Sequence, residues 1–179
     1  ADCASCAPTA TGRALYATLL GKLPGGRDTL VAMLDDHRPH VVERAIGLLV
    51  HLRLSDADHA LGEQLSHASD RVRQAAALGL AAFPESAFAA DALLRAVPDA
   101  APAVRLTATV ALQARRESRL APALVQRLQA EPELDIQIAL VTALGRLAAH
   151  DGVQKLIALA NPEQRKQRHR DASVLRLSA

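Results

Sequence analysis

Apolar residues recur along this chain with helical spacing, and the same pattern returns several times. Four segments share one register, and their first residues are Val42, Val72, Val104 and Ile136, which lie 30, 32 and 32 positions apart. In each segment, positions one, four, five and eight carry small or aliphatic side chains, which places them on one face of a helix. The pattern therefore predicts four helices that each bury this face.

A further helix is predicted before each of these four. The expected ranges are about 27–36, 56–67, 86–97 and 118–130. The turns within each pair carry residues that suit a helix start, namely Pro39, Asp70, Pro102 and Pro132. Each pair should form a helical hairpin, and because one hairpin cannot bury its apolar face alone, the hairpins should stack.

One segment carries a recognisable motif. Val72-Arg73-Gln74-Ala75-Ala76, followed by Leu80, has the pattern Val-Arg-x-Ala-Ala. This pattern resembles the second helix of HEAT-like repeats of the phycobilisome-lyase type, and the resemblance covers about residues 26–160. It implies an all-α fold in which helical hairpins stack into a right-handed α-α superhelix. Members of this family serve as scaffolds, assembly factors, bilin lyases, a di-iron hydroxylase and DNA glycosylases, so the resemblance is specific for fold and not for function. The alternative is an ordinary helical bundle, which several matches in one register disfavour.

The register also divides the chain into sections. Residues 1–25 are expected to form an irregular segment with a capping helix, and residues 161–179 a basic capping helix or tail. Between them we expect four to five repeats, at about 26–54, 55–83, 84–116, 117–148 and, in part, 149–160.

Composition and charge agree with thin layers of helix. Half of the residues are hydrophobic, yet the aromatic ones are only Tyr16, Phe83 and Phe88, so Ala, Leu and Val must fill the core. The net charge is +2, and residues 161–179 hold five basic and two acidic residues. The tail is therefore a basic cap of the stack or an arm that reaches an acidic partner. The rest of the chain is close to neutral, which gives little support for a nucleic-acid surface.

The second helices should line an inner, concave surface, where positions two, three, six and ten point away from the core. The candidate partner-binding residues on this surface are Arg73, Gln74, Arg105, Leu106, Thr109, Gln137, Ile138 and Val141. The surface begins charged and becomes apolar at Leu106, Ile138 and Val141, and an exposed apolar patch usually marks a binding site. In the other interpretation, the C-terminal helix covers this patch.

Two arginines of this surface have a second interpretation. Arg73 and Arg105 occupy equivalent positions in successive repeats. They either bond to Asp70 or Asp99 in an internal ladder, which we favour, or bind carboxylates of a partner.

Metal-binding residues are sparse. Cys3 and Cys6 form a Cys-x-x-Cys motif without the following His of a haem attachment site, so they are candidates for a disulfide, free thiols or two ligands of a metal. His59, Glu63 and His67 recur every four residues and would share one helical face, which could hold a transition metal. The di-iron hydroxylase of the resembling family uses His-Glu dipeptides, and this chain has none.

No motif for nucleophilic catalysis or phosphate binding is present in the sequence. We therefore expect a scaffold or accessory subunit without enzymatic activity or cofactor, which binds another protein on its concave face. The alternative is a cofactor- or metal-handling factor that uses the cysteine pair and the histidines. No stretch reaches the roughly 18 apolar residues of a membrane span, so we expect a soluble protein, cytoplasmic or periplasmic.

Overall fold

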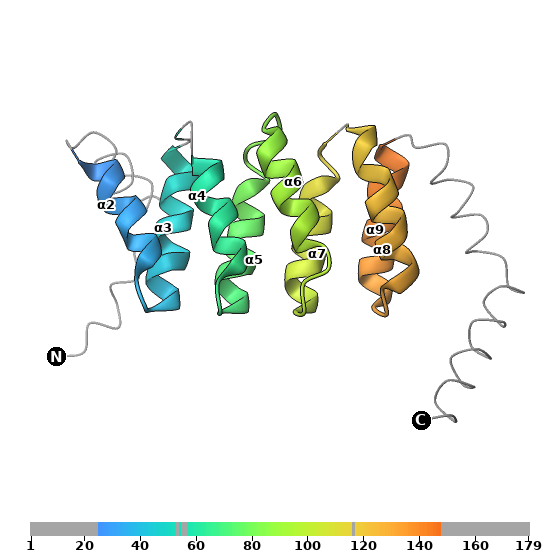
Figure 1. The fold of residues 1–179 in the computed structure, drawn as a ribbon, viewed down its shortest axis with the longest axis horizontal. Helices are drawn as coiled ribbons and strands as arrows, with labels where there is room; N and C mark the ends of the chain where they lie inside the picture. Colours follow the sequence, from blue (N-terminus) through green and yellow to red (C-terminus); the bar gives the residue numbers. More distant parts are fainter. Residues whose placement is uncertain (1–24, 53, 55–56, 116, 148–179) are drawn as a thin grey trace, which may run out of the picture. The chain divides into compact units, whose positions relative to one another are not determined.

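The computed structural model describes residues 25–52, 54, 57–115 and 117–147. Within these ranges the chain has eight α-helices, three short 3-10 helices and no strand (Figure 1). The prediction of an all-α fold of helical hairpins is confirmed. The chain divides into two compact units, Ala1–Arg115 and Arg116–Ala179, and each is described by itself.

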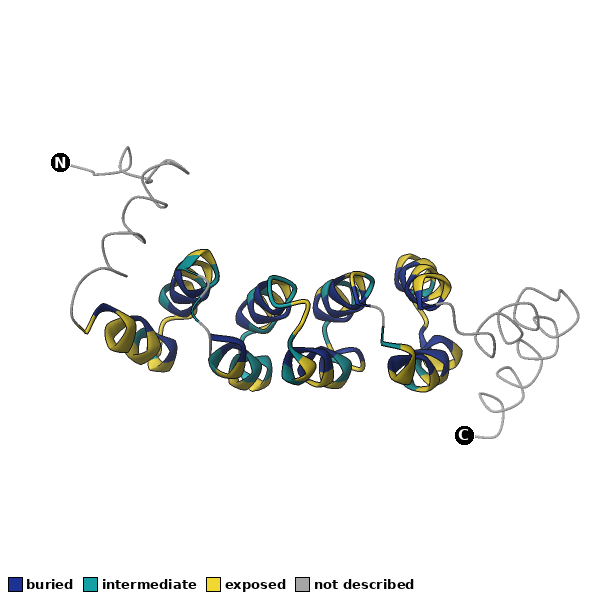
Figure 2. Cartoon of the chain, turned by 90° about the horizontal axis from the view of Figure 1, so that it is seen from above, coloured by how far each residue is buried: buried dark blue, intermediate teal, exposed yellow. Residues whose placement is uncertain are grey.

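The described part of the first unit holds three hairpins. The first consists of α2 (Gly26–Ala32), a 3-10 turn at Met33–Asp35 and α3 (Pro39–Leu52). The second consists of α4 (Ala57–Glu63), a 3-10 turn at Gln64–Ser66 and α5 (Asp70–Leu80), and the third of α6 (Ala87–Ala96) and α7 (Pro102–Leu112). Helices α2, α4 and α6 form one layer and α3, α5 and α7 the other (Figure 2).

The second unit holds one hairpin within its described residues. A 3-10 turn at Ser118–Leu120 leads into α8 (Ala121–Ala130), which is followed by α9 (Leu134–Arg146). Leu124 and Leu140 are fully buried between the two helices.

The leading residues of the predicted register form the centre of the core. Val42, Val72, Val104 and Ile136 are at most 2 % exposed, which confirms their assignment. The remaining core consists largely of leucine and alanine, and small side chains let helices approach closely. Gly79 of α5 shows how close: a Cβ there would lie 3.0 Å from Val50 of α3 and 3.1 Å from Leu61 of α4.

One turn geometry recurs before all four second helices. The residue three positions before each helix accepts a hydrogen bond from the backbone N–H two residues later. The acceptors are Asp36 (2.8 Å), His67 (2.9 Å), Asp99 (2.8 Å) and Glu131 (3.2 Å). This side-chain turn fixes the entry into the helix. Three of the predicted helix starters, Pro39, Asp70 and Pro102, are the first residues of their helices, whereas Pro132 lies two residues before α9.

No helix in the described ranges is both long enough and apolar enough to cross a lipid bilayer.

Candidate protein-interaction surface

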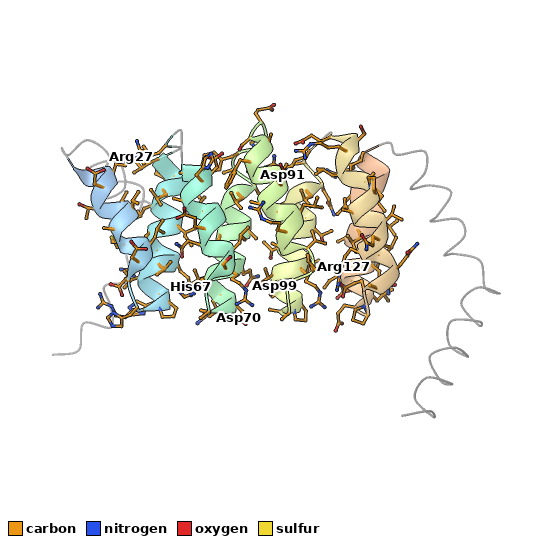
Figure 3. The ribbon with its side chains drawn as sticks, viewed as in Figure 1. Arg27, His67, Asp70, Asp91, Asp99 and Arg127 are labelled. Carbon is orange, nitrogen blue, oxygen red and sulfur yellow. The ribbon has the colours of Figure 1, made fainter. Side chains whose placement is uncertain are left out.

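Arg73 connects the second and third hairpins instead of facing solvent. Its guanidinium donates two hydrogen bonds to the carboxylate of Asp99, at 2.8 and 2.9 Å, and two to the backbone carbonyls of His67 and Ala68, at 2.9 and 3.1 Å. Figure 3 shows His67 and Asp99 at the same end of the hairpins. The predicted ladder is therefore present at Arg73, with Asp99 as the acid, and this pair is called the ladder below. Asp70 instead accepts the N–H of Arg71 at 2.8 Å.

The ladder also shifts the titration of its members. Burial acts to raise the pKa of Asp99, but the hydrogen bonds from Arg73 and from the N–H of Ala101 outweigh it, and the pKa is lowered. The pKa of Arg73 is raised because its hydrogen bonds to Asp99 favour the charged form. Both side chains are mostly buried, so the pair stabilises the joint between hairpins.

Arg105 repeats the turn-bracing role of Arg73. Its Nη1 donates to the carbonyls of Asp99 and Ala100, both at 3.0 Å, and the residue is buried. The prediction that Arg105 is exposed for a partner is wrong. In the second unit, Gln137 occupies the same position and donates to the carbonyl of Glu131 at 2.6 Å. Position two of each of these three second helices thus holds the preceding turn.

Position six also differs from the prediction in α5 and α7, although Gly47 at this position of α3 is exposed. Thr109 is fully buried, and its hydroxyl donates to the carbonyl of Arg105 at 2.8 Å. Ala77, at position six of α5, is fully buried as well. A helix inside a stack has neighbours on its flanks as well as a partner behind it, so its buried arc is wider than that of a single amphipathic helix. The prediction that Thr109 faces a partner is wrong.

The other predicted residues keep an accessible position. Gln74 is exposed, and its amide donates to the hydroxyl of Thr107 at 3.3 Å. Leu106 is half-buried. In the second unit, Ile138 and Val141 of α9 are 56 % and 39 % exposed. Leu106 belongs to the first unit, and Ile138 and Val141 belong to the second.

Sequence reasoning missed two of the most exposed aliphatic residues in the described chain. Leu78 of α5 is 66 % exposed and Val110 of α7 is 50 % exposed. Both stand at position seven of their segments, and α5 and α7 pack side by side. We call Gln74, Leu78, Leu106 and Val110 the α5/α7 face. The sequence did contain a signal for these two residues, namely a large aliphatic side chain at the same non-core position in two successive repeats.

The positions that border this face hold no acidic side chain. Positions three, seven and ten of α3, α5 and α7 include no carboxylate. The neighbouring helix α3 instead presents Arg44 and His51, both exposed. Within the described residues, the side chain of Arg44 makes no ion pair or hydrogen bond. The apolar α5/α7 face therefore lies beside a helix that exposes the guanidinium of Arg44 and also carries Glu43.

The histidine arrangement does not form the predicted metal site. Helix α4 ends at Glu63 and continues as a 3-10 turn, so His67 leaves the four-residue spacing. The Nδ1 of His67 accepts the N–H of Ser69, and the ring of His59 stacks on Phe88 with the centroids 3.9 Å apart. Within the described ranges no group of three or more His, Cys, Asp or Glu residues could hold a metal ion. The prediction for His59, Glu63 and His67 is wrong, and Cys3 and Cys6 lie outside the described residues.

Comparison with known families supports the repeat class. The family model of HEAT repeats matches residues 59–145. Residues 59–145 are a HEAT repeat region. This HEAT region begins in α4 and ends in α9, and it includes both arginine-braced turns and the α5/α7 face. No curated protein showed significant similarity to the chain.

Proposed function

We propose that the chain is an interaction module that binds a segment of another protein on the α5/α7 face, and that it acts by binding and not by catalysis. The observation that carries the proposal is the pair Leu78 and Val110. Two large aliphatic side chains remain exposed at the same register position on adjacent helices. Repeat proteins of this kind use one face of their stacked helices for binding.

The chemistry of the face defines the partner. Leu78 and Val110 gain free energy when apolar side chains cover them. Gln74 and the half-buried Leu106 add uncharged area around them. Arg44, on the next helix, offers an exposed guanidinium that suits a carboxylate. The partner is therefore an amphipathic segment with aliphatic side chains and an acidic residue at the end that reaches α3.

The arginines of the ladder are not part of this surface. Arg73 is bound to Asp99, and Arg105 to backbone carbonyls. If either arginine bound a partner, it would have to break the hydrogen bonds that hold its turn. The surface is thus smaller than the one predicted from sequence, and it reaches further along α5 and α7, to Leu78 and Val110.

A library of displayed peptides tests this function, because it samples many possible partner segments at once. Selection on the immobilised full chain should enrich sequences that combine aliphatic residues with Asp or Glu. Fluorescence anisotropy of an enriched peptide then measures affinity for the variants. We expect Leu78→Lys and Val110→Lys each to weaken binding about tenfold or more, because a charge replaces a buried aliphatic contact.

The control is Glu85→Lys, an exposed substitution in the turn before α6. It shifts the charge in the same direction, by two units instead of one, away from the face and should leave the affinity unchanged. Enriched peptides that bind the Leu78→Lys and Val110→Lys variants as well as the wild type would show that the face is not the binding site.

A further inference from the structure

Helix α9 carries an aliphatic stripe of its own. Leu134, Ile138 and Val141 are 61 %, 56 % and 39 % exposed, and their spacing of four and three places them on one helical face. The stripe continues to Gly145, which is also exposed. Half of the exposed large hydrophobic residues in the described chain thus lie on this single helix. Such a stripe is the usual contact surface of one helix with another.

The stretch one repeat after α9 is polar, although aliphatic residues stand before it at 153–160 and after it at 174–177. The repeat spacing of 32 would place the next second helix near residue 168. Residues 162–171, which surround that position, contain no Ala, Val, Leu, Ile or Met and no Phe, Tyr or Trp. This part of the chain therefore has no aliphatic side chain to set against Ile138.

The stripe is complementary to itself in the antiparallel direction. A two-fold axis between positions 139 and 140 places Ile138 opposite Val141 of a second α9 helix. The same axis places Leu134 opposite Gly145. Gly145 is exposed and has no side chain, and a Cβ there would meet no atom within 4 Å, so the leucine of the second helix can approach its backbone closely. Each contact occurs twice, as a two-fold interface requires.

The charges at the two ends of α9 fit the same arrangement. Glu133 precedes the helix and Arg146 ends it, and both side chains are exposed. The two-fold axis that pairs Ile138 with Val141 brings Glu133 of one chain opposite Arg146 of the other. A parallel arrangement would instead place like charges together at both ends, which is unfavourable.

We propose that a second copy of this chain docks on α9, with the two α9 helices antiparallel and Ile138 packed against Val141 across a two-fold axis. This surface belongs to the second unit and is separate from the α5/α7 face. One 13-residue helix per chain is a small contact, so the dimer is of the transient class. It should dissociate on dilution through the range of roughly 1–100 μM.

Sedimentation equilibrium of the full chain across a concentration series measures this association. We expect the mass of two chains at the highest concentrations and of one chain at the lowest. Ile138→Glu should weaken the dimer by roughly 100-fold or more, because two carboxylates enter an apolar contact. Residue 138 is exposed in the single chain, so its circular dichroism spectrum should not change.

Leu78→Lys is the matched control. It also places a charge on an exposed aliphatic residue of a second helix, but in the first unit. It should weaken peptide binding at the α5/α7 face about tenfold or more and leave the dimer constant unchanged. The proposal of peptide binding at the α5/α7 face and the proposal of a dimer through α9 can therefore be refuted independently.

A mixing experiment tests the antiparallel geometry. Glu133→Arg and Arg146→Glu should each weaken self-association by about tenfold, since each variant alone sets like charges opposite one another at both ends. An equimolar mixture of the two variants restores opposite charges at both ends and should associate as the wild type does. A wild-type chain that stays monomeric throughout the series overturns the proposal. So does an Ile138→Glu chain that associates normally, or a mixture no stronger than its separate components.

Discussion

Arg73 and Asp99 form the polar contact that joins the second hairpin to the third. Their bidentate pair is largely shielded from water, and the same arginine also holds two carbonyls of its own turn. Breaking a shielded pair leaves one partner without compensation, which costs more than breaking a surface pair. The contact should therefore respond measurably both to substitution and to pH.

We expect Asp99→Asn to lower the free energy of unfolding by about 2 kcal/mol at pH 7. The pKa of Asp99 is lowered in the folded chain, so its stabilisation is present above the unfolded pKa of about 4 and is lost as pH falls through the folded value. The difference between wild type and variant should therefore shrink below about pH 4. Urea denaturation at a series of pH values measures it.

Arg73→Met provides the comparison for this pair. Adding Asp99→Asn to it should cost less than Asp99→Asn alone, because the pair is already broken. Two substitutions whose costs simply add would show that the pair contributes no coupling.

Two glycines within helices should respond in opposite ways to substitution by alanine. A Cβ on Gly47 of α3 would meet nothing within 4 Å, whereas a Cβ on Gly62 of α4 would lie 2.6 Å from the ring of Phe88. Gly47→Ala should therefore raise the free energy of unfolding by about 0.5–1 kcal/mol through helix propensity. Gly62→Ala should lower it by about 1–3 kcal/mol, since the ring is held against His59. Thermal denaturation of both variants measures the contrast, and equal signs would contradict it.

Single-residue exposure was the part of the structure that the sequence predicted least well. The core positions followed from one helix considered alone, because the apolar spacing marks the face that packs against its hairpin partner. Thr109 and Arg105 were placed wrongly because their burial depends on more than the face of one helix. Leu78 was missed for the same reason, since a wheel for one helix does not show which edge of the stack stays open.

At the scale of helices and turns, Arg115 is the main side chain that holds α7 to the preceding turn, and the repeat pattern did not predict this role. It follows α7 and is buried, and its guanidinium donates to the carbonyls of Leu80, Phe83, Pro84 and Ser86 at 2.7–3.4 Å. These carbonyls belong to the end of α5 and the turn into α6. Because the last carbonyls of a helix lack partners within the helix, the arginine satisfies groups that would otherwise be costly to bury.

Arg115→Leu should lower the free energy of unfolding by about 3 kcal/mol, because several carbonyls lose their donor at once. Chemical denaturation followed by circular dichroism measures the loss. Arg119→Leu, which removes an exposed arginine paired with Glu117, should change stability by about 0.5 kcal/mol or less. Equal effects of the two substitutions would show that Arg115 is not a brace.

Elements were predicted better than their ends. Proline and aspartate marked the starts of α3, α5 and α7 because they favour the first turn. The recurring acceptor at Asp36, His67, Asp99 and Glu131 was not identified, because three different residue types perform one role. Because a histidine is not expected as the acceptor in such a turn, His67 was considered as a metal ligand. Its Nδ1 instead accepts a backbone N–H.

For the whole molecule, the spacing of the leading residues was sufficient to predict the repeat class, because stacked hairpins must bury the same positions in every copy. It was not sufficient to locate the binding surface. The α5/α7 face and the α9 stripe depend on which side chains remain uncovered after stacking, and this is a property of the assembled layers. Function in such a chain therefore follows from what stacking leaves open.

Stacked repeats contact only their neighbours, and this should make damage local. Leu140 of α9 is fully buried, and Leu140→Ala should cost about 2–5 kcal/mol. Hydrogen exchange of the full chain should then accelerate in α8 and α9, while α4 and α5 keep their wild-type rates. Leu61→Ala, at a fully buried position of α4, should give the reverse pattern. Equal acceleration across both units in either variant would show that the chain unfolds as one cooperative block. A substitution in one unit would then disturb both the α5/α7 face and the α9 stripe.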